Sequence, residues 1–282
     1  MASLDDLLVL ALKTMPEKPP DDAPQPSKKR YSEQLSQVIA NAFAEELRER
    51  GMREARPAPP GEVGLSGAER RLAGGIGAKK VDVTWATEES GLLLALSVKT
   101  ISFRDVRSGN FQKNLTNRRG DMLIEAVTLH RRFPYAVLGG FLFLDWEAQS
   151  DNTEGRESTF QNAHHRLRMF TGRYDPAGRD EQWERLYLLA LDANQFRPRL
   201  LMNEVGRPLE EITLASAFDE LVLLVAERNF DFYDAVEGKV HRVTDRARRR
   251  TTQAGEITLE EDGPSLDDVL LDDDMTEPPG DA

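Results

Sequence analysis

The residues of this sequence whose types and spacing suit chemistry are Asp82, Ser97 and Lys99. Lys99 follows the apolar run of residues 92–96, which is apolar enough to form a buried strand. A lysine at the end of such a strand is costly unless a negative group lies beside it. Asp82, in the strand-like run of residues 81–85, is the acidic side chain best placed to reach it. The spacing therefore predicts a charged pair on neighbouring strands.

The two strands are expected to form a hairpin, because a polar turn of residues 87–91 separates them. Side chains alternate between the two faces of a strand, so Ser97 and Lys99 share one face. Centring the hairpin on this turn places Asp82 opposite Leu96 or Ser97. This register brings the Asp82 carboxylate to the part of the second strand from which Lys99 projects.

Helical patterns lie on both sides of this hairpin. An apolar stripe predicts a helix from Tyr31 to Gly51, and the capping-box spacing of residues 66–69 predicts a short helix that ends near Gly74. The later pattern predicts a loop over 104–117, a helix over 122–133, a strand over 135–144, a helix over 159–170, a strand over 184–191, a hairpin over 199–208 and a helix over 214–228. The fold class expected is α/β, with helices flanking a mixed central β-sheet.

The order helix, strand, strand, helix, strand resembles the core of the restriction-endonuclease-like fold, the PD-(D/E)xK nuclease superfamily. Asp82 matches the aspartate of that motif, and Ser97-Val98-Lys99 falls at the (Asp/Glu)-x-Lys position. Glu69, on the helix expected before the sheet, matches a glutamate found in many members. The resemblance covers roughly residues 60–145.

The resemblance implies metal-dependent hydrolysis of phosphodiester bonds in DNA. Asp82 would be the central ligand of Mg²⁺ or Mn²⁺, Glu69 an auxiliary ligand, and Lys99 the catalytic lysine. A divalent cation stabilises charge on the phosphate oxygens and lowers the pKa of a bound water, and a lysine adds positive charge beside the phosphate. The biological setting that the resemblance suggests is bacterial restriction or phage defence in a cytoplasm.

Ser97 departs from the family pattern, because the family usually has an acidic residue at that position. A hydroxyl is a poorer ligand for Mg²⁺ than a carboxylate. Two interpretations follow: the metal is held by Asp82, Glu69, backbone and water, or the protein has lost catalysis and binds nucleic acid or scaffolds a complex.

Each site residue also has a purely structural interpretation. Capping alone explains Glu69, Lys99 can extend its ammonium to solvent, and Ser97 suits an ordinary strand. The rival carboxylates for the auxiliary position are Glu45, Glu46 and Glu62. Asp121 and Glu125 are spaced i, i+4 on the helix that follows the hairpin, where they either face the site or belong to its surface.

The net charge of −12 hides a basic region. Eleven acidic residues in 255–282 account for −11 of it, which leaves −1 for residues 1–254. Residues 99–132 carry eight lysines and arginines against three acids, a local charge of +5 that favours phosphate. The candidate DNA-binding residues of this region are Arg104, Arg107, Lys113, Asn114, Arg118 and Arg119. The alternative is a solvated charged loop.

Three parts are expected along the chain. Residues 1–30 read as a flexible N-terminal segment with a Pro-rich linker, 31–240 as the nuclease-like domain, and 241–282 as a basic arm followed by an acidic disordered tail. One peptide of the first part, Ser3-Leu4-Asp5-Asp6-Leu7-Leu8, recurs in the last as Ser265-Leu266-Asp267-Asp268-Val269-Leu270-Leu271. These copies either dock a protein partner or match by chance. A homodimer is also possible, since cutting both strands of DNA takes two sites.

Composition excludes several classes of protein. The sequence has no cysteine, which rules out disulfides and cysteine-bound zinc, and four histidines make a histidine-rich metal site improbable. No apolar run is long enough for a membrane span, and the first residues lack the basic region of a signal peptide. We therefore expect a cytoplasmic protein without a membrane partner.

Overall fold

The computed structural model describes residues 4–59, 70–73, 78–155, 157–194 and 196–243. They belong to one unit that ends at Val243. Most of the basic arm and all of the acidic tail expected over 241–282 lie outside the described residues. The second copy of the repeated peptide, residues 265–271, is among them. In the described part of the chain, no helix combines the length and apolarity needed to cross a bilayer.

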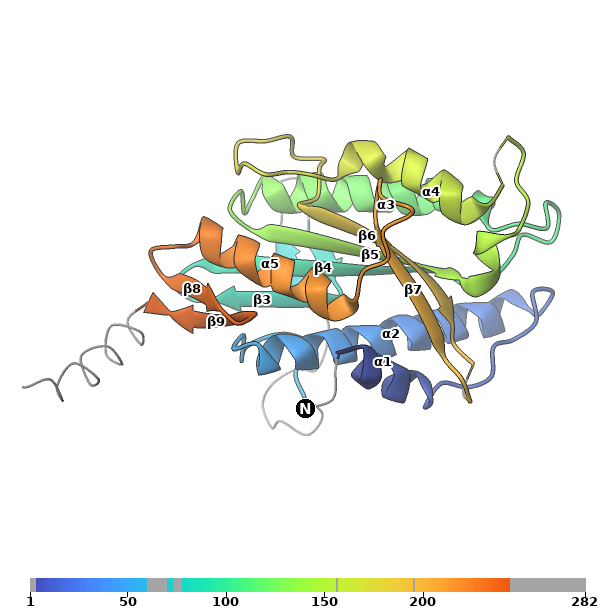
Figure 1. The fold of residues 1–282 in the computed structure, drawn as a ribbon, viewed down its shortest axis with the longest axis horizontal. Coiled ribbons are helices and arrows are strands. Elements are labelled where there is room, and N and C mark those ends of the chain that lie inside the picture. Colours follow the sequence, from blue (N-terminus) through green and yellow to red (C-terminus); the bar gives the residue numbers. More distant parts are fainter. Residues whose placement is uncertain (1–3, 60–69, 74–77, 156, 195, 244–282) are drawn as a thin grey trace, which may run out of the picture. The chain divides into compact units, whose positions relative to one another are not determined.

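A five-stranded mixed sheet runs through the centre of this unit (Figure 1). Its strands, in spatial order, are β3 Val83–Thr87, β4 Gly91–Ile101, β5 Val137–Asp145, β6 Arg185–Asp192 and β7 Arg199–Glu204. The central pairs β4–β5 and β5–β6 are parallel, and the outer pairs β3–β4 and β6–β7 are antiparallel. The predicted mixed α/β fold is therefore confirmed.

Helices cover both faces of the sheet. In Figure 1, α3 and α4 lie along its upper side and α1 and α2 along its lower side. One face packs against α1 (Leu4–Leu12), α2 (Gln25–Glu49) and α5 (Leu214–Arg228), and the other against α3 (Gln112–His130) and α4 (Thr159–Leu167). Burial on both sides explains why β5 has no polar side chain from Val137 to Leu144, as its sequence predicted.

Two short antiparallel ribbons and two 3₁₀ turns complete the described elements. β1 (Arg70–Ala73) pairs with β2 (Ala78–Val81), and β8 (Tyr233–Val236) pairs with β9 (Lys239–Arg242). The 3₁₀ turns are η1 (Trp146–Gln149) and η2 (Arg168–Phe170). Gly51 ends α2 with a φ of 94°, the left-handed conformation that makes glycine the usual residue after a helix.

The prediction of a flexible segment over residues 1–30 is wrong for the residues described. Leu8 and Leu12 of α1 are buried in the core, and the Asp5 carboxylate accepts a weak hydrogen bond from the Leu214 N–H. α2 begins at Gln25, because its proline lies in the first turn, where no intrahelical N–H bond is lost. Leu8 of the first copy of the repeated peptide therefore packs in the core of its own domain, while Asp6 of the same copy is exposed.

Three further predictions of local structure are corrected. Residues 70–73, expected to end a helix, form β1, while residues 66–69 lie outside the described part of the chain. The loop expected over 104–117 ends at the start of α3, whose first turn is anchored by the buried Leu115. The hairpin expected over 199–208 is instead formed by β6 and β7. The helix predicted over 214–228 is confirmed by α5.

Candidate active site

The hairpin of β3 and β4 brings Asp82 and Lys99 together, as the spacing predicted. Val83 pairs with Leu96, so Asp82, directly before β3, lies beside Ser97 of β4. The Asp82 Oδ2 atom accepts a hydrogen bond of 2.7 Å from the Val98 N–H. The same oxygen lies 3.6 Å from the Lys99 Nζ atom. The backbone bond fixes the carboxylate where it faces the lysine.

A third charged group, Glu125, reaches this pair from α3. Its Oε2 atom lies 3.0 Å from Lys99 Nζ and accepts a hydrogen bond of 3.1 Å from the Ser97 hydroxyl. Glu125 is only 4% exposed, and its second oxygen, Oε1, is buried without a hydrogen-bond partner among the described residues. Glu125 thus supplies a carboxylate beside Ser97, at the point where the strand itself carries none.

The sequence contained a signal for Glu125 that the strand-based motif did not use. Met122, Glu125 and Leu129 are spaced i, i+3 and i+7, so an acidic side chain lies within the apolar stripe of α3. All three are buried in the structure. The neighbouring candidate, Asp121, is 55% exposed at its side chain and pairs with Arg118 at 3.2 Å, which leaves it on the surface.

The surroundings shift the pKa values of both members of the buried pair. Burial alone would lower the pKa of the Lys99 ammonium, but attraction to Glu125 and Asp82 outweighs it and raises the pKa above its usual value. Burial raises the pKa of Glu125, because the favourable charge of Lys99 does not fully offset the loss of water. Lys99 is therefore cationic at neutral pH, and the Glu125 carboxylate is incompletely compensated.

The other predicted site residues have different positions. Ser97 is fully buried, and its described contact is the hydrogen bond to Glu125, so it orients a carboxylate and does not face solvent. Glu69 lies outside the described residues, as does Glu62. Glu45 and Glu46 form ion pairs with Arg48 and Arg50 along α2.

Metal-binding groups are sparse in the described part of the chain. No cluster of three or more histidine, aspartate and glutamate side chains there is arranged to hold a metal ion. Two carboxylates, those of Asp82 and Glu125, nevertheless converge on one ammonium group. Both would have oxygen atoms to offer a hard divalent cation if Lys99 shifted toward solvent.

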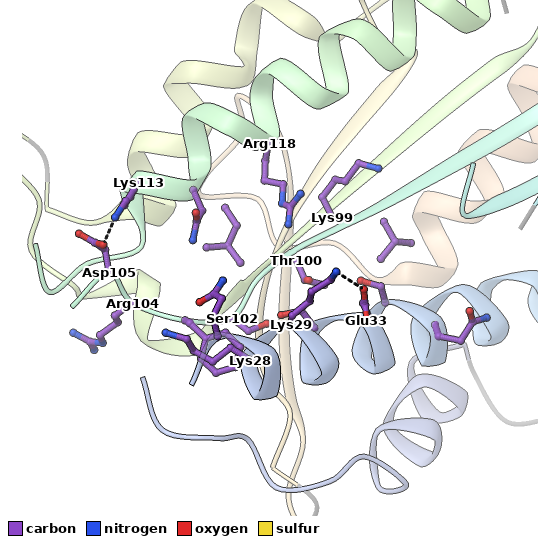
Figure 2. Close-up of a pocket in the computed structure, with 18 of the residues that line it drawn as sticks. Lys28, Lys29, Glu33, Lys99, Thr100, Ser102, Arg104, Asp105, Lys113 and Arg118 are labelled. Atoms are coloured by element: carbon purple, nitrogen blue, oxygen red, sulfur yellow. Dashed lines mark hydrogen bonds and ion pairs between the residues drawn. The ribbon is translucent and has the colours of Figure 1, made fainter. Parts of the chain in front are cut away.

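Lys99 also lines an open groove of about 810 Å³ between the beginnings of α2 and α3 (Figure 2). Its charged lining residues are the cations Lys28, Lys29, Lys80, Lys99, Arg104, Lys113 and Arg118 and the acids Glu33 and Asp105. Seven positive against two negative side chains make the groove suitable for phosphate groups. The charged pair is therefore not sealed off, because its lysine belongs to the wall of this groove.

Four of the six predicted nucleic-acid-binding residues line the groove: Arg104, Lys113, Asn114 and Arg118. Arg107 and Arg119 are not part of its lining. The lysines of α2 were missed by sequence reasoning, because they lie about seventy positions before Lys99 in the chain and no local pattern links them to it.

Comparison with known proteins adds no independent identification. No protein-family model, curated protein or solved structure matches this chain. The function must therefore be argued from the geometry of the site and the groove.

Proposed function

We propose that this protein is a metal-dependent nuclease of the restriction-endonuclease-like class that acts on DNA. The observation that carries the proposal is the convergence of Asp82, Lys99 and Glu125 at the wall of a basic groove. The strand lacks an acid at Ser97, yet a carboxylate from another element reaches the hydroxyl of that residue. The site therefore contains a carboxylate at the position where the short strand motif lacks one.

The order of elements supports this assignment. After α2 come the short β1–β2 ribbon, the antiparallel hairpin of β3 and β4, the crossover helix α3 and the parallel strand β5. Apart from the inserted ribbon, this is the order of the core in the family that the sequence resembles. Lys99 lies near the carboxyl end of β4, and the groove opens at the same end. Ligands of open α/β sheets commonly bind at the carboxyl ends of the strands.

The residues present suit a hard divalent cation such as Mg²⁺ or Mn²⁺. The buried Oε1 atom of Glu125 has no described hydrogen-bond partner, and a buried carboxylate oxygen in that condition is costly unless something satisfies it. Asp82 and Glu125 would hold the ion, with Glu69 a further candidate. When bound, such an ion neutralises phosphate charge and acidifies a coordinated water.

The chain's own residues have separate tasks in this proposal. The Lys99 ammonium, at the wall of the groove, binds the phosphate that is cleaved and orients the attacking water. The Ser97 hydroxyl is a positioning group, because it donates to the Glu125 carboxylate and lies away from solvent. The cationic lining of the groove holds neighbouring phosphates.

Plasmid and linear DNA incubated with Mg²⁺ or Mn²⁺ test this proposal. We expect the wild type to cleave, and Asp82→Ala, Glu125→Gln and Lys99→Ala each to lose about 10²-fold or more in rate, the order expected for a charged group acting on the transition state. Asp121→Asn is the matched control, since it removes an exposed carboxylate from the same helix. Undiminished cleavage by Glu125→Gln and Lys99→Ala would refute the proposed site.

One observation favours a second candidate, a catalytically silent protein that binds nucleic acid or scaffolds a defence or repair complex. The described residues offer two converging carboxylates, and no group of three is arranged for a metal. DNA binding without cleavage by the wild type and all the variants would support this alternative. A role in restriction or phage defence, and a homodimer with two sites, follow only from the family resemblance.

A further inference from the structure

One polar surface of the groove takes no part in the proposed bond cleavage, although its two lysines belong to the cationic lining. It is the side of α2 that faces the groove, opposite α3 (Figure 2). We call it the α2 polar stripe, and its donor residues are Gln25, Lys28, Lys29, Ser32, Ser36 and Gln37. Their spacing of three or four positions places them along one side of the helix.

The α2 polar stripe has the composition of a surface that contacts phosphates. Lysine, serine and glutamine side chains all donate hydrogen bonds, and these residue types make many of the contacts between proteins and nucleic-acid backbones. Glu33 is the one acid of α2 that lines the groove, and its Oε1 atom lies 3.8 Å from the Lys29 Nζ atom. The stripe borders the buried side of the helix, which carries Tyr31, Leu35 and Ile39.

The stripe is held firmly in place against the end of β4. The Lys28 Nζ atom donates a hydrogen bond of 2.9 Å to the Asp21 carbonyl and lies 5.8 Å from the centre of the Phe103 ring. The Asp21 carboxylate accepts a hydrogen bond of 3.1 Å from the Arg104 N–H. These contacts join the beginning of α2 to the segment that follows β4, which also lines the groove.

We propose that the α2 polar stripe binds the sugar–phosphate backbone of the nucleic acid whose cleaved phosphate lies at Lys99. This deepens the proposed function and rests on it, since the groove is taken to hold a nucleic acid. From Gln25 to Gln37 the helix rises about 18 Å. At about 3.4 Å per nucleotide along one strand, that length corresponds to roughly five phosphates.

A pair of charge reversals on α2 tests the inference. Lys29→Glu changes an exposed residue that lines the groove, and Arg30→Glu makes the same change at its exposed neighbour, which does not line it. Binding of a short labelled DNA duplex to the full chain is measured by fluorescence anisotropy in EDTA, over a series of salt concentrations. Equal unfolding midpoints would show that both variants fold.

We expect Lys29→Glu to weaken binding about eightfold or more at ~0.1 M salt, as for the loss of one phosphate contact. The slope of the logarithm of the binding constant against the logarithm of the salt concentration should become shallower by about 0.9. Arg30→Glu should leave that slope unchanged. Equal effects of both reversals, no effect of Lys29→Glu, or no binding by the wild type would each overturn the inference. If DNA is cleaved but neither binding nor cleavage depends on Lys29, the proposed function stands and this inference fails. If binding depends on Lys29 but no DNA is cleaved, the inference stands and the proposed nuclease activity fails.

Discussion

Replacing Glu184 with glutamine should destabilise the protein strongly. Glu184 is fully buried, and its Oε1 atom accepts hydrogen bonds from Arg173 at 3.2 Å and Arg228 at 2.6 Å. Its Oε2 atom accepts one from the Leu138 N–H at 2.6 Å and lies 3.3 Å from the His130 Nε2 atom. This single carboxylate therefore connects β5, β6, α5 and the end of α3, the helix that carries Glu125.

The size of the effect follows from the charges left behind. Glu184→Gln keeps the volume of the side chain, but it leaves two buried guanidinium groups without their shared counter-charge. Removing one partner of a buried ion pair typically costs about 3–5 kcal/mol. For a unit of this size, each kcal/mol lowers the melting temperature by roughly 2–4 °C, so we expect a fall of roughly 6–20 °C.

Urea unfolding followed by tryptophan fluorescence measures this loss, because the neighbouring residue Trp183 is fully buried in the native state. The control is Glu181→Gln, which removes a partly exposed carboxylate paired with Arg179. An exposed pair of that kind contributes at most about 1 kcal/mol. A free energy of unfolding for Glu184→Gln within about 1 kcal/mol of the wild type would show that the charge is not required.

Three further predictions concern stability around the sheet and α3. Burial opposes ionisation of Glu184, but its interactions with His130, Arg228 and Leu138 outweigh burial and lower its pKa. The stability that this carboxylate contributes is therefore complete above its unfolded pKa of about 4.3 and is lost as the pH falls through the lower pKa of the folded state. Urea unfolding should show the stabilities of the wild type and Glu184→Gln converging below about pH 4. Gly140→Ala places a Cβ atom against Leu186 Cδ2 and 2.8 Å from Met122 Cε, and it should cost about 1–3 kcal/mol by overpacking. Gly120→Ala, in open space on α3, should instead gain about 0.5–1 kcal/mol in thermal unfolding. Ser97→Ala should cost about 1 kcal/mol in urea unfolding through its lost bond to Glu125, and if the nuclease assignment holds, it should slow cleavage less than Glu125→Gln does.

Local rules were sufficient for the strands that carry Asp82 and Lys99. Alternation with period two and one polar turn determine which side chains share a face, and the observed pairing of Val83 with Leu96 agrees with the expected register. The apolar run of β5 and the amphipathic pattern of α5 were equally predictable, because burial leaves a direct pattern in sequence.

Elements whose sequence pattern has a second explanation were misread. Prolines around residues 16–26 indicated a linker, although a proline within the first turn of a helix costs no hydrogen bond, and α2 starts among them. The first turns of α3 were predicted to be a loop because most of their residues are polar, and one side of the helix faces the groove. Leu115 is the one buried residue in these turns, which is too little for an apolar stripe.

Lys99 and Glu125 are each a charged residue at a position where the sequence pattern predicts burial. A lysine on a buried strand and a glutamate within an apolar helical stripe are each unfavourable alone, and helix α3 crosses the sheet where the two can meet. Stability does not explain the pair, since a well-packed apolar substitute for a buried ion pair is often as stable or more so. The pair lies at the wall of a groove lined by seven cations. This position is typical of perturbed charges that belong to a functional site, and it gives a reason other than stability for keeping them.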